Sequence, residues 1–555
     1  MTANPASTWA LNLLAELARN GLRQVVIAPG SRSQALALAA LELERRGSLT
    51  VHVRSDERVA GFLALGLSRE SGRAAAVVTT SGTAVANLHP AVLEAHHAGV
   101  GLLVLSADRP EEARGTGVNQ TTVQAGIFAG AMRWQDDVSV AADPVQAADQ
   151  AIRIARRAWS GARRGPAHLN VAFLEPLSGE AIEAQPSPAD PAPVAAEPTV
   201  LDLSPLIGTV VIAGADAGPI AEQTARELGA PLIAEVSSGA RFGPALVAAY
   251  RSLLDDADFG GAVRRAIVFG HPTLSRQVPA LLESGSVEVI IVRSSTADVY
   301  NPGRRAAAIV DRVRVPGPVD ADPEARAWLG SWVHTGRALR EPDGTGLPTA
   351  TEPQTPAQRS QYARAELAVS RAAVTREDLV DAVWRLTWPH DRLVLGSSRL
   401  IRVADDRVPG KRITVHANRG LAGIDGTIAT ALGVALESQG PENSGAAGIT
   451  RVLLGDLTAL HDSGALQLPP GSSPRIQVIV GNDGGGTIFD TLEVTETADR
   501  ADIDRVLYTP QVVDFAALAA AYGWHYRRAG TRGELEQVLT APTIAPTLIE
   551  IPLPR

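Results

Sequence analysis

The chain has 555 residues, no cysteine, and 51 lysine and arginine residues against 60 aspartate and glutamate residues, which gives a formal net charge of −9. The lack of cysteine excludes disulfides, thiolate nucleophiles and Cys-based metal sites, and a single lysine, Lys411, argues against Schiff-base chemistry and phosphate-loop NTPases. The mild acidity argues against a nucleic-acid partner. No apolar run approaches the roughly 18–20 residues of a membrane span. Residues 1–10 lack a signal-type core, so we expect a cytoplasmic protein.

Two stretches have the composition of linkers. Residues 178–199 include a proline-rich run that suits neither a helix nor a central strand. Residues 341–356 are rich in Pro, Gly and Thr. They divide the chain into three expected domains, at 1–178, 200–340 and 358–555, and roughly three domains is also what the length suggests.

Short apolar runs alternate with runs of helical periodicity along the chain. The patterns predict helices over 8–19, 34–46, 57–70 and 83–97, and strands over 24–28, 49–53, 74–79, 101–106, 209–213, 266–269, 393–395, 451–454 and 477–480. Continuous apolar strands that alternate with helices predict an α/β fold of doubly wound parallel-sheet domains. Ligands of such sheets bind at the carboxyl ends of the strands, so we look for function in the loops that follow them.

Two of these loops carry an aspartate. Asp456 follows one predicted strand, and Asp483 follows the next, 27 residues later, in the loop Asn482-Asp483-Gly484-Gly485-Gly486. Each aspartate alone is best explained as a helix cap beside a glycine turn. Together, two carboxylates at neighbouring strand ends, beside glycines whose N–H groups are free, suit a magnesium-bound diphosphate.

The pair resembles the diphosphate motif of thiamine-diphosphate enzymes, in which Gly-Asp-Gly is followed further along the chain by Asn-Asn. Two positions depart from that pattern, because Leu457 replaces the third residue of the first part and Asp483 replaces the last asparagine. The resemblance implies thiamine diphosphate as cofactor and Mg²⁺, with Mn²⁺ as an alternative, held by Asp456, Asp483 and the carbonyl of Gly485.

A glutamate that hydrogen-bonds the aminopyrimidine N1′ is the other hallmark of these enzymes. Residues 53–62, a predicted strand running into a helix, resemble the family segment that carries it, and the match places Glu57 on N1′. Taken alone, a glutamate in a first helical turn needs no more explanation than the helix dipole. The presence of the metal motif in the same chain favours the catalytic role.

Five further runs resemble one branch of this superfamily, the 2-succinyl-5-enolpyruvyl-6-hydroxy-3-cyclohexene-1-carboxylate synthases of menaquinone biosynthesis. These runs are residues 28–33, 80–88, 106–110, 117–120 and 417–426. The resemblance covers the first and third domains and is weak over 200–340. It implies decarboxylation of 2-oxoglutarate, 1,4-addition of the four-carbon unit to isochorismate, and a homodimer or tetramer with active sites between subunits.

The resemblance also assigns individual residues. For the cofactor these are Glu57, Thr80, Gly82, Ile424, Gly455, Asp456, Leu457, Asp483, Gly485 and Ile488. On the isochorismate side they are Ser31, Arg32, Arg109, Asn119 and Gln120; for the succinyl carboxylate, Ser398, Arg402 and Arg419; as an apolar wall, Ile488, Phe489 and Leu492. Arg276 is a further candidate from the middle domain, which we otherwise expect to be structural.

Two alternatives remain open at this point. One is another thiamine-diphosphate enzyme, such as a 2-oxoacid decarboxylase or an acetohydroxyacid-synthase-like carboligase. The other is a non-catalytic nucleotide-binding protein, for which the short loop from Gly214 to Gly218 gives weak support because it lacks the full glycine spacing of a dinucleotide site.

Overall fold

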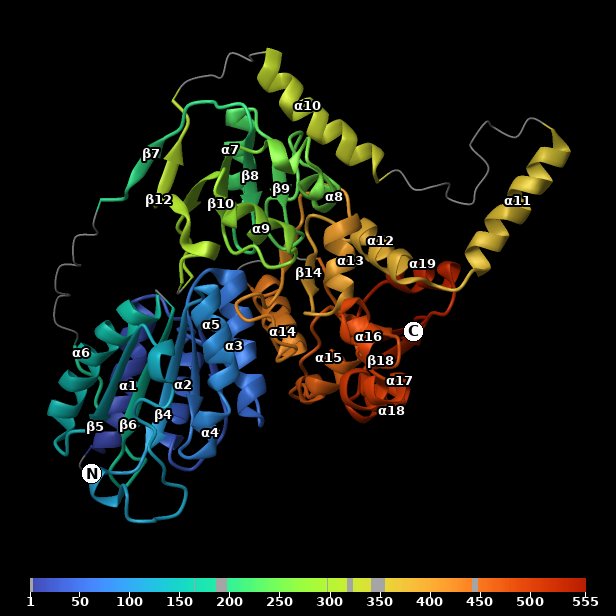
Figure 1. Ribbon diagram of the computed structural model, residues 1–555. Coiled ribbons are helices and arrows are strands. Elements are labelled where there is room, and N and C mark those ends of the chain that lie inside the picture. Colours follow the sequence, from blue (N-terminus) through green and yellow to red (C-terminus); the bar gives the residue numbers. More distant parts are fainter. Residues whose placement is uncertain are drawn as a thin grey trace.

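The computed structural model describes residues 3–163, 165–185, 197–296, 298–316, 323–340, 355–441 and 448–555. These residues form three layered α/β units, each built around one main parallel sheet with helices on its faces (Figure 1). The predicted fold class is therefore confirmed. The predicted linkers at 178–199 and 341–356 lie partly outside the described residues.

The first unit contains a six-stranded parallel sheet in the order β2-β1-β3-β4-β6-β5. Its strands are β1 (Gln24–Ile27), β2 (Thr50–Val53), β3 (Ala75–Thr79), β4 (Leu102–Asp108), β5 (Trp134–Ser139) and β6 (Pro166–Ala172). Its helices are α1 (Pro5–Arg19), α2 (Gln34–Arg45), α3 (Glu57–Ser71), α4 (Thr83–Ala86), α5 (His89–Ala98) and α6 (Pro144–Ala162). The central strands are buried on both faces, which explains their continuous apolar runs.

One predicted helix of this unit is divided in the structure. The pattern over 83–97 predicts a single helix, but the chain forms α4 and α5 with a break at Asn87 and Leu88. Pro90 stands in the first turn of α5, where its missing N–H costs nothing. Proline inside a continuous helix would remove a hydrogen bond and clash with the preceding turn, so the helix restarts instead.

The middle unit has a five-stranded parallel sheet in the order β12-β11-β10-β8-β9, and β7 pairs with β13 beside it. The strands are β7 (Val200–Asp202), β8 (Thr209–Ala213), β9 (Leu232–Ala234), β10 (Arg265–Phe269), β11 (Glu288–Val292), β12 (Ala306–Val310) and β13 (Arg312–Arg314). The helices are α7 (Ile220–Leu228), α8 (Tyr250–Asp255), α9 (Gln277–Glu283) and α10 (Pro323–Ala338).

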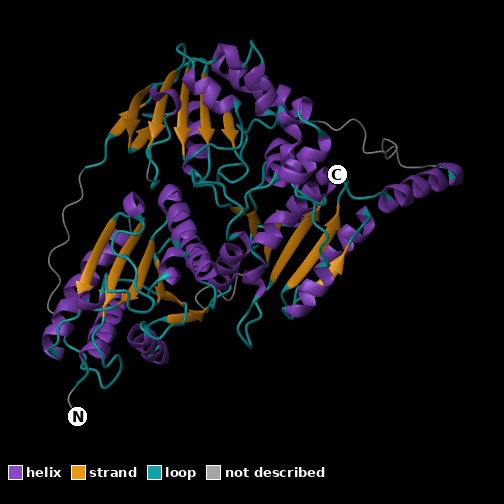
Figure 2. Ribbon diagram, turned by 60° about the horizontal axis from the view of Figure 1, so that its bottom comes forward, coloured by secondary structure: helices purple, strands orange, loops and turns teal. Residues whose placement is uncertain are grey.

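The third unit has a six-stranded parallel sheet in the order β15-β14-β16-β17-β19-β18. Figure 2 shows the sheets of the molecule in orange, with helices in purple beside them. Its strands are β14 (Arg392–Leu395), β15 (Thr414–His416), β16 (Thr450–Gly455), β17 (Ile476–Asn482), β18 (His525–Arg528) and β19 (Thr547–Pro552). Its helices are α11 (Pro356–Arg371), α12 (Arg376–Leu386), α13 (Arg399–Arg407), α14 (Thr427–Ser438), α15 (Asp456–His461), α16 (Val494–Thr497), α17 (Arg500–Ile503), α18 (Phe515–Ala521) and α19 (Arg532–Thr540). Helix α11 extends away from the rest of the molecule in Figure 1.

The first and third units share one hydrophobic core. Helices α3 and α14 pack directly on each other, and the buried residues around them come from both sheets. The contact is close because glycines stand at the crossing. A Cβ on Gly66 would lie 2.0 Å from the Thr430 carbonyl oxygen, and one on Gly433 would lie 2.3 Å from the Leu63 carbonyl oxygen. These two glycines therefore allow α3, the helix after β2, to pack closely on α14 of the third unit.

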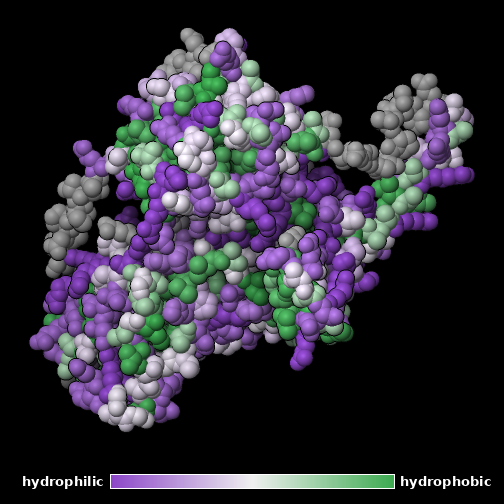
Figure 3. Space-filling model, in the orientation of Figure 1, coloured by the Kyte–Doolittle hydropathy of each residue, from purple (hydrophilic) through white to green (hydrophobic). Residues whose placement is uncertain are grey.

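Hydrophilic residues cover much of the face shown in Figure 3, with smaller hydrophobic groups between them. Within the residues that the structure describes, no helix is both long and apolar enough to cross a membrane.

Candidate active site

The two aspartates singled out in the sequence lie at the carboxyl edge of the third sheet. Strands β16 and β17 are parallel neighbours with Gly455 opposite Gly481, so Asp456 and Asp483 follow adjacent strand ends. Asp456 is 3% exposed and accepts the N–H of Leu457 at 2.8 Å. Burial, reinforced by the negative charge of Asp483, raises the pKa of Asp456 to about 6. A cation between the two carboxylates would remove this cost.

The loop after β17 takes a shape that requires glycine. Gly485 has a φ of +145°, and a Cβ there would lie 2.5 Å from the carbonyl oxygen of Tyr508. The N–H of Gly486 donates to that oxygen at 2.7 Å, and the N–H of Gly485 bonds the carboxyl of Asp456. The Gly485 carbonyl accepts from Thr487 at 3.0 Å. Since an oxygen of this kind has a second lone pair, it can still face a cation.

This donor set fits magnesium. In the described part of the chain, no three His, Cys, Asp or Glu side chains lie together in a way that could hold a metal ion. A cation here would therefore be held by two carboxylates and a main-chain oxygen, with its other positions left for water and phosphate oxygens. That is the coordination that Mg²⁺ prefers beside a phosphorylated ligand.

Sequence reasoning missed one residue of this site. Arg376, the first residue of α12, is 9% exposed, and its Nη2 lies 2.9 Å from Oδ2 of Asp483. The Thr487 hydroxyl donates to the same oxygen. Both contacts fix the orientation of Asp483 and leave its other oxygen available. No local motif marks Arg376, because the packing of α12 against the sheet brings it here from 107 positions away.

Glu57 occupies the first position of α3. Asp56 caps the helix by accepting the N–H groups of Arg58 and Val59, and Asn87 donates to Oε2 of Glu57 at 3.3 Å. This helix end contacts the third unit, because Arg58 donates to the carbonyl of His461 at 2.7 Å. His461 ends α15, the helix that begins at Asp456 and spans about 9 Å. One short helix therefore connects the surroundings of Glu57 to the aspartate pair.

The loops at the carboxyl edge of the first sheet are packed onto one another. A Cβ on Gly30 would lie 2.2 Å from the Cβ of Thr80, so the loops after β1 and β3 touch only because residue 30 is glycine. The Ser81 hydroxyl donates to the Gln120 carbonyl, and the Gln120 amide donates to the Ser81 carbonyl, both at 2.9 Å. Gly82 donates its N–H to Oε1 of Gln124 at 2.8 Å.

The predicted residues of this edge differ in exposure. The Arg32 side chain is 12% exposed, with Nη2 3.2 Å from Glu175, and Arg109 directly follows β4 and is partly buried. Ser31 and Asn119 are exposed. The structure therefore gathers the residues predicted for the isochorismate side around loops after β1, β3 and β4.

The residues predicted for the succinyl carboxylate follow β14 and β15, the next strands along the third sheet. Ser398 caps α13, and Arg402 donates to its carbonyl at 3.1 Å. Arg419 is 3% exposed and donates to the Thr273 hydroxyl through Nε at 2.9 Å. Burial lowers the pKa of both Arg402 and Arg419. Arg276 is exposed and follows Thr273 by three positions.

The apolar residues lie beside these groups. Ile424 is partly buried and precedes α14 by three positions. Ile488 and Phe489 are partly buried in the turn that follows the glycine loop, and Leu492, just beyond it, is 38% exposed.

Two comparisons establish the kind of fold. Residues 8–127 match the family model described as the thiamine pyrophosphate enzyme, N-terminal TPP binding domain. The structure is similar to that of benzoylformate decarboxylase from Polynucleobacter necessarius, with a TM-score of 0.67 over 100% of this chain and 99% of that chain. Their sequences are 15% identical, so this likeness concerns the fold.

Sequence relatives are closer. The protein named 2-succinyl-5-enolpyruvyl-6-hydroxy-3-cyclohexene-1-carboxylate synthase from Leifsonia xyli is 56% identical, over 100% of this chain and 97% of the relative. Proteins with the same name from Clavibacter michiganensis and Kineococcus radiotolerans are 55% and 44% identical, over 100% and 97% of this chain and 97% and 94% of the relatives. The chain thus belongs to the family of 2-succinyl-5-enolpyruvyl-6-hydroxy-3-cyclohexene-1-carboxylate synthases, which are thiamine-diphosphate-dependent enzymes.

Proposed function

We propose that this chain decarboxylates 2-oxoglutarate and adds the remaining four-carbon unit to isochorismate in a 1,4 sense. The products are CO₂ and the compound after which its relatives are named, an intermediate of menaquinone biosynthesis. The observation that carries this proposal is the 56% identity to such a synthase over the whole chain. The carboxyl edges of the first and third sheets supply the groups that the reaction needs.

Asp456, Asp483 and the Gly485 carbonyl are proposed to hold Mg²⁺ or Mn²⁺, and through it the diphosphate of the cofactor. Gly455 and Leu457 flank the first of these ligands. The buried aspartate whose pKa is raised and the glycine loop that no other residue fits both support this assignment. When bound, thiamine diphosphate supplies the electron sink for decarboxylation, so neither a cysteine nor a lysine nucleophile is required.

Glu57 is proposed to hydrogen-bond the aminopyrimidine N1′ of the cofactor. Its position at the start of α3 exposes one carboxylate oxygen, while the amide of Asn87 steadies the other. Thr80 and Gly82 are proposed to contact the same ring, and Ile424 to support the bent form of the cofactor. The close packing of the loops around Thr80 gives this surface a fixed shape.

The arginines are proposed to bind the carboxylates of the two substrates. Guanidinium binds carboxylate through two parallel hydrogen bonds. Ser398, Arg402 and Arg419 would hold the distal carboxylate of 2-oxoglutarate, with Arg276 as an additional cation. The isochorismate side would use Ser31, Arg32, Arg109, Asn119 and Gln120. Ile488, Phe489 and Leu492 would exclude water from the reacting centre, where decarboxylation disperses charge.

We also propose a cytoplasmic homodimer or tetramer with its active sites between subunits. The proposed domains are 1–178 for the pyrimidine, 200–340 as a central unit, and 358–555 for the diphosphate. A cavity of about 420 Å³ opens between α5 and the loop before α14, and Leu421 at its edge is 54% exposed. Apolar surface beside a site suits a second subunit. Sedimentation that shows a fully active monomer would contradict the proposal.

The decisive test of the activity is an assay with purified protein, thiamine diphosphate, Mg²⁺, 2-oxoglutarate and isochorismate, following CO₂ and the adduct. Formation of both is expected. Turnover of pyruvate without isochorismate would favour a different carboligase. Failure to bind thiamine diphosphate in the presence of Mg²⁺ would favour a non-catalytic nucleotide-binding protein.

A further inference from the structure

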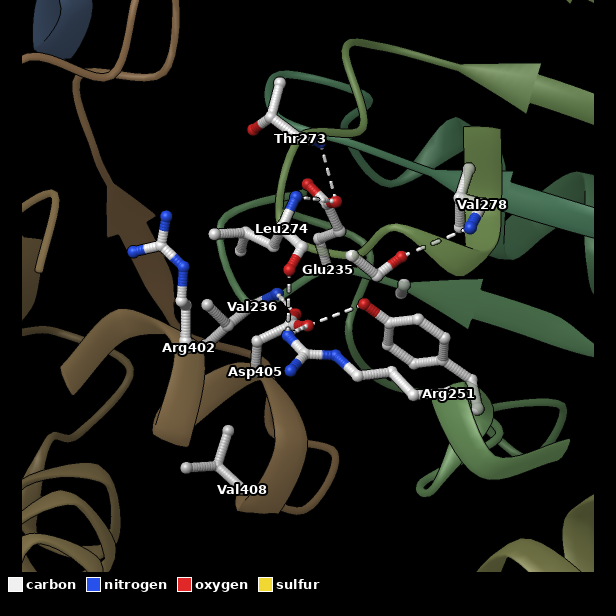
Figure 4. Close-up of polar contacts among 12 residues, drawn as sticks. Glu235, Val236, Arg251, Thr273, Leu274, Val278, Arg402, Asp405 and Val408 are labelled. Carbon is white, nitrogen blue, oxygen red and sulfur yellow. Dashed lines mark hydrogen bonds and ion pairs between the residues drawn. The ribbon is translucent and has the colours of Figure 1, made fainter. Parts of the chain in front are cut away.

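The middle unit meets the third unit at the carboxyl edges of their two sheets. Figure 4 shows this junction, with Glu235 and Val236 just after β9 and Thr273 and Leu274 in the loop after β10. Across from them in the figure lies α13, which carries Arg402. Arg419, in the loop after β15, donates to Thr273. The junction therefore borders the residues proposed for the distal carboxylate of 2-oxoglutarate.

Glu235 holds the loop after β10 in place. It is 1% exposed, and its Oε1 accepts the N–H of Thr273 at 2.7 Å and of Leu274 at 2.6 Å. The other oxygen, Oε2, has no hydrogen-bond partner among the described residues. Burial, together with the negative charge of Asp405, raises the pKa of Glu235 to about 8. Both N–H groups of the loop therefore end on one oxygen of this buried carboxyl group.

The same loop holds Arg419. The Thr273 hydroxyl accepts from Nε at 2.9 Å and from Nη2 at 2.7 Å, and the Thr273 carbonyl accepts from Nη2 at 3.2 Å. In the described part of the chain, none of the ion pairs includes Arg419. A buried guanidinium held by neutral acceptors keeps its full charge for a bound anion.

A second contact reaches the other arginine. Asp405 on α13 accepts the N–H of Val236 at 2.8 Å, the hydroxyl of Tyr250 at 2.6 Å and Nη2 of Arg251 at 2.5 Å. Asp405 lies three positions after Arg402, so these bonds fix the helix that carries it. Consecutive residues after β9 thus hold α13, which carries Arg402, and the Thr273 loop, which contacts Arg419.

We propose that Glu235 is a positioning residue for the distal carboxylate of 2-oxoglutarate: it fixes the Thr273 loop, and that loop orients the guanidinium of Arg419. The middle unit would then also shape the substrate site through this loop, in addition to the cation proposed at Arg276. This inference rests on the proposed role of Arg419 in binding 2-oxoglutarate.

The test uses two matched pairs of variants in the full-length holoenzyme. Thr273→Val removes the hydroxyl acceptor at nearly constant volume and is expected to raise KM for 2-oxoglutarate about tenfold, whereas Thr273→Ser keeps the hydroxyl and should stay within about threefold of the wild type. Glu235→Ala is expected to raise the same KM about tenfold. Glu235→Gln keeps an acceptor oxygen for both N–H groups and should restore the KM to within about threefold.

Three controls separate the possible failures. KM for isochorismate and the affinity for thiamine diphosphate should change less than twofold in all four variants. Glu222→Ala, which removes another buried glutamate of the middle unit, should leave the KM for 2-oxoglutarate unchanged. Arg419→Ala tests the underlying assignment, because an unchanged KM there would overturn the role of Arg419 itself.

If Arg419→Ala weakens 2-oxoglutarate binding but Thr273→Val does not, the positioning role is wrong and the binding role stands. Should Glu235→Ala fail to fold, the Thr273 pair still decides the question. The double variant Arg419→Ala, Thr273→Val should match Arg419→Ala alone, since both changes remove the same interaction. Additive losses would overturn the proposal.

Discussion

Replacement of Gly66 by alanine tests the packing that joins the first and third units. Gly66 lies inside α3, and an added Cβ would stand 2.0 Å from the carbonyl oxygen of Thr430 on α14. The obstacle is backbone, so no side-chain rotation can relieve it. The two helices must separate by roughly 1.5 Å to restore an ordinary contact distance.

The energetic outcome follows from two opposing effects. Alanine favours a helix over glycine by about 1 kcal/mol. A gap of only about 0.5–1 Å already forfeits a quarter to a half of the dispersion attraction along the contact, and overpacking of this kind costs about 1–3 kcal/mol or more. We expect a net loss of about 2 kcal/mol and a fall in Tm of about 4–8 °C. Because Glu57 begins α3, a displacement of this size should also lower kcat by up to about 100-fold.

Thermal unfolding and the coupled assay measure both effects, and Gly330→Ala provides the matched control. Gly330 lies inside α10, is exposed, and a Cβ there meets no atom within 4 Å. The same substitution should therefore raise Tm slightly and leave the activity unchanged. A Gly66→Ala variant that is as stable and as active as the wild type would refute the close-packing argument.

Three further outcomes are expected. Glu57→Gln should keep the thermal unfolding profile and lose most of the activity, and an unchanged kcat would refute its assigned role. Removal of divalent cations with EDTA should abolish activity, and Mg²⁺ or Mn²⁺ should restore it. Burial lowers the pKa of His168 to about 4 in the folded protein. As the pH falls below about 6.5, this histidine therefore becomes protonated in the unfolded chain while it stays neutral in the folded protein. This group should therefore cost roughly 2 kcal/mol of stability by pH 5, and His168→Gln should flatten the decline in a series of denaturant titrations.

The fold was predictable because its strands are buried on both faces. In a chain that also shows helical periodicity, a short continuous apolar run such as 209–213 is explained by a parallel strand covered by helices on both faces. Strand β8 spans the same residues. The ends of other strands were less certain. Strand β4 continues to Asp108, two residues beyond the predicted end, and the buried Asp108 carboxylate accepts a hydrogen bond from Asn170 on β6. The polarity of Asp108 hid this end of the strand, and only the tertiary partner explains it.

The site was predictable where one loop carries both the chemistry and the backbone shape. Asp483 and Gly485 are two positions apart in the chain, and the glycine is required there by a φ of +145°. Arg376 was not predictable, since its contact with Asp483 depends on where α12 packs. These residues show a general limit of prediction from sequence motifs. A motif identifies the loop that carries the candidate ligands, but it does not identify residues of other elements that orient those ligands.

The middle unit illustrates the same limit in a stronger form. Besides its side-chain contacts, three of its main-chain N–H groups matter here: that of Val236 donates to Asp405 of the third unit, and those of Thr273 and Leu274 hold the loop that contacts Arg419. A main-chain donor can be supplied by almost any residue type, provided that the loop keeps its path. The sequence resemblance is weak over 200–340 although the junction lies beside the arginines. The residue that must be kept there is the one that accepts these hydrogen bonds. For the N–H groups of Thr273 and Leu274, that acceptor is Glu235. In other chains, a buried glutamate directly after a short apolar strand of the middle domain is therefore the feature to look for. It would indicate a middle domain that holds the loop in contact with the substrate-binding arginine.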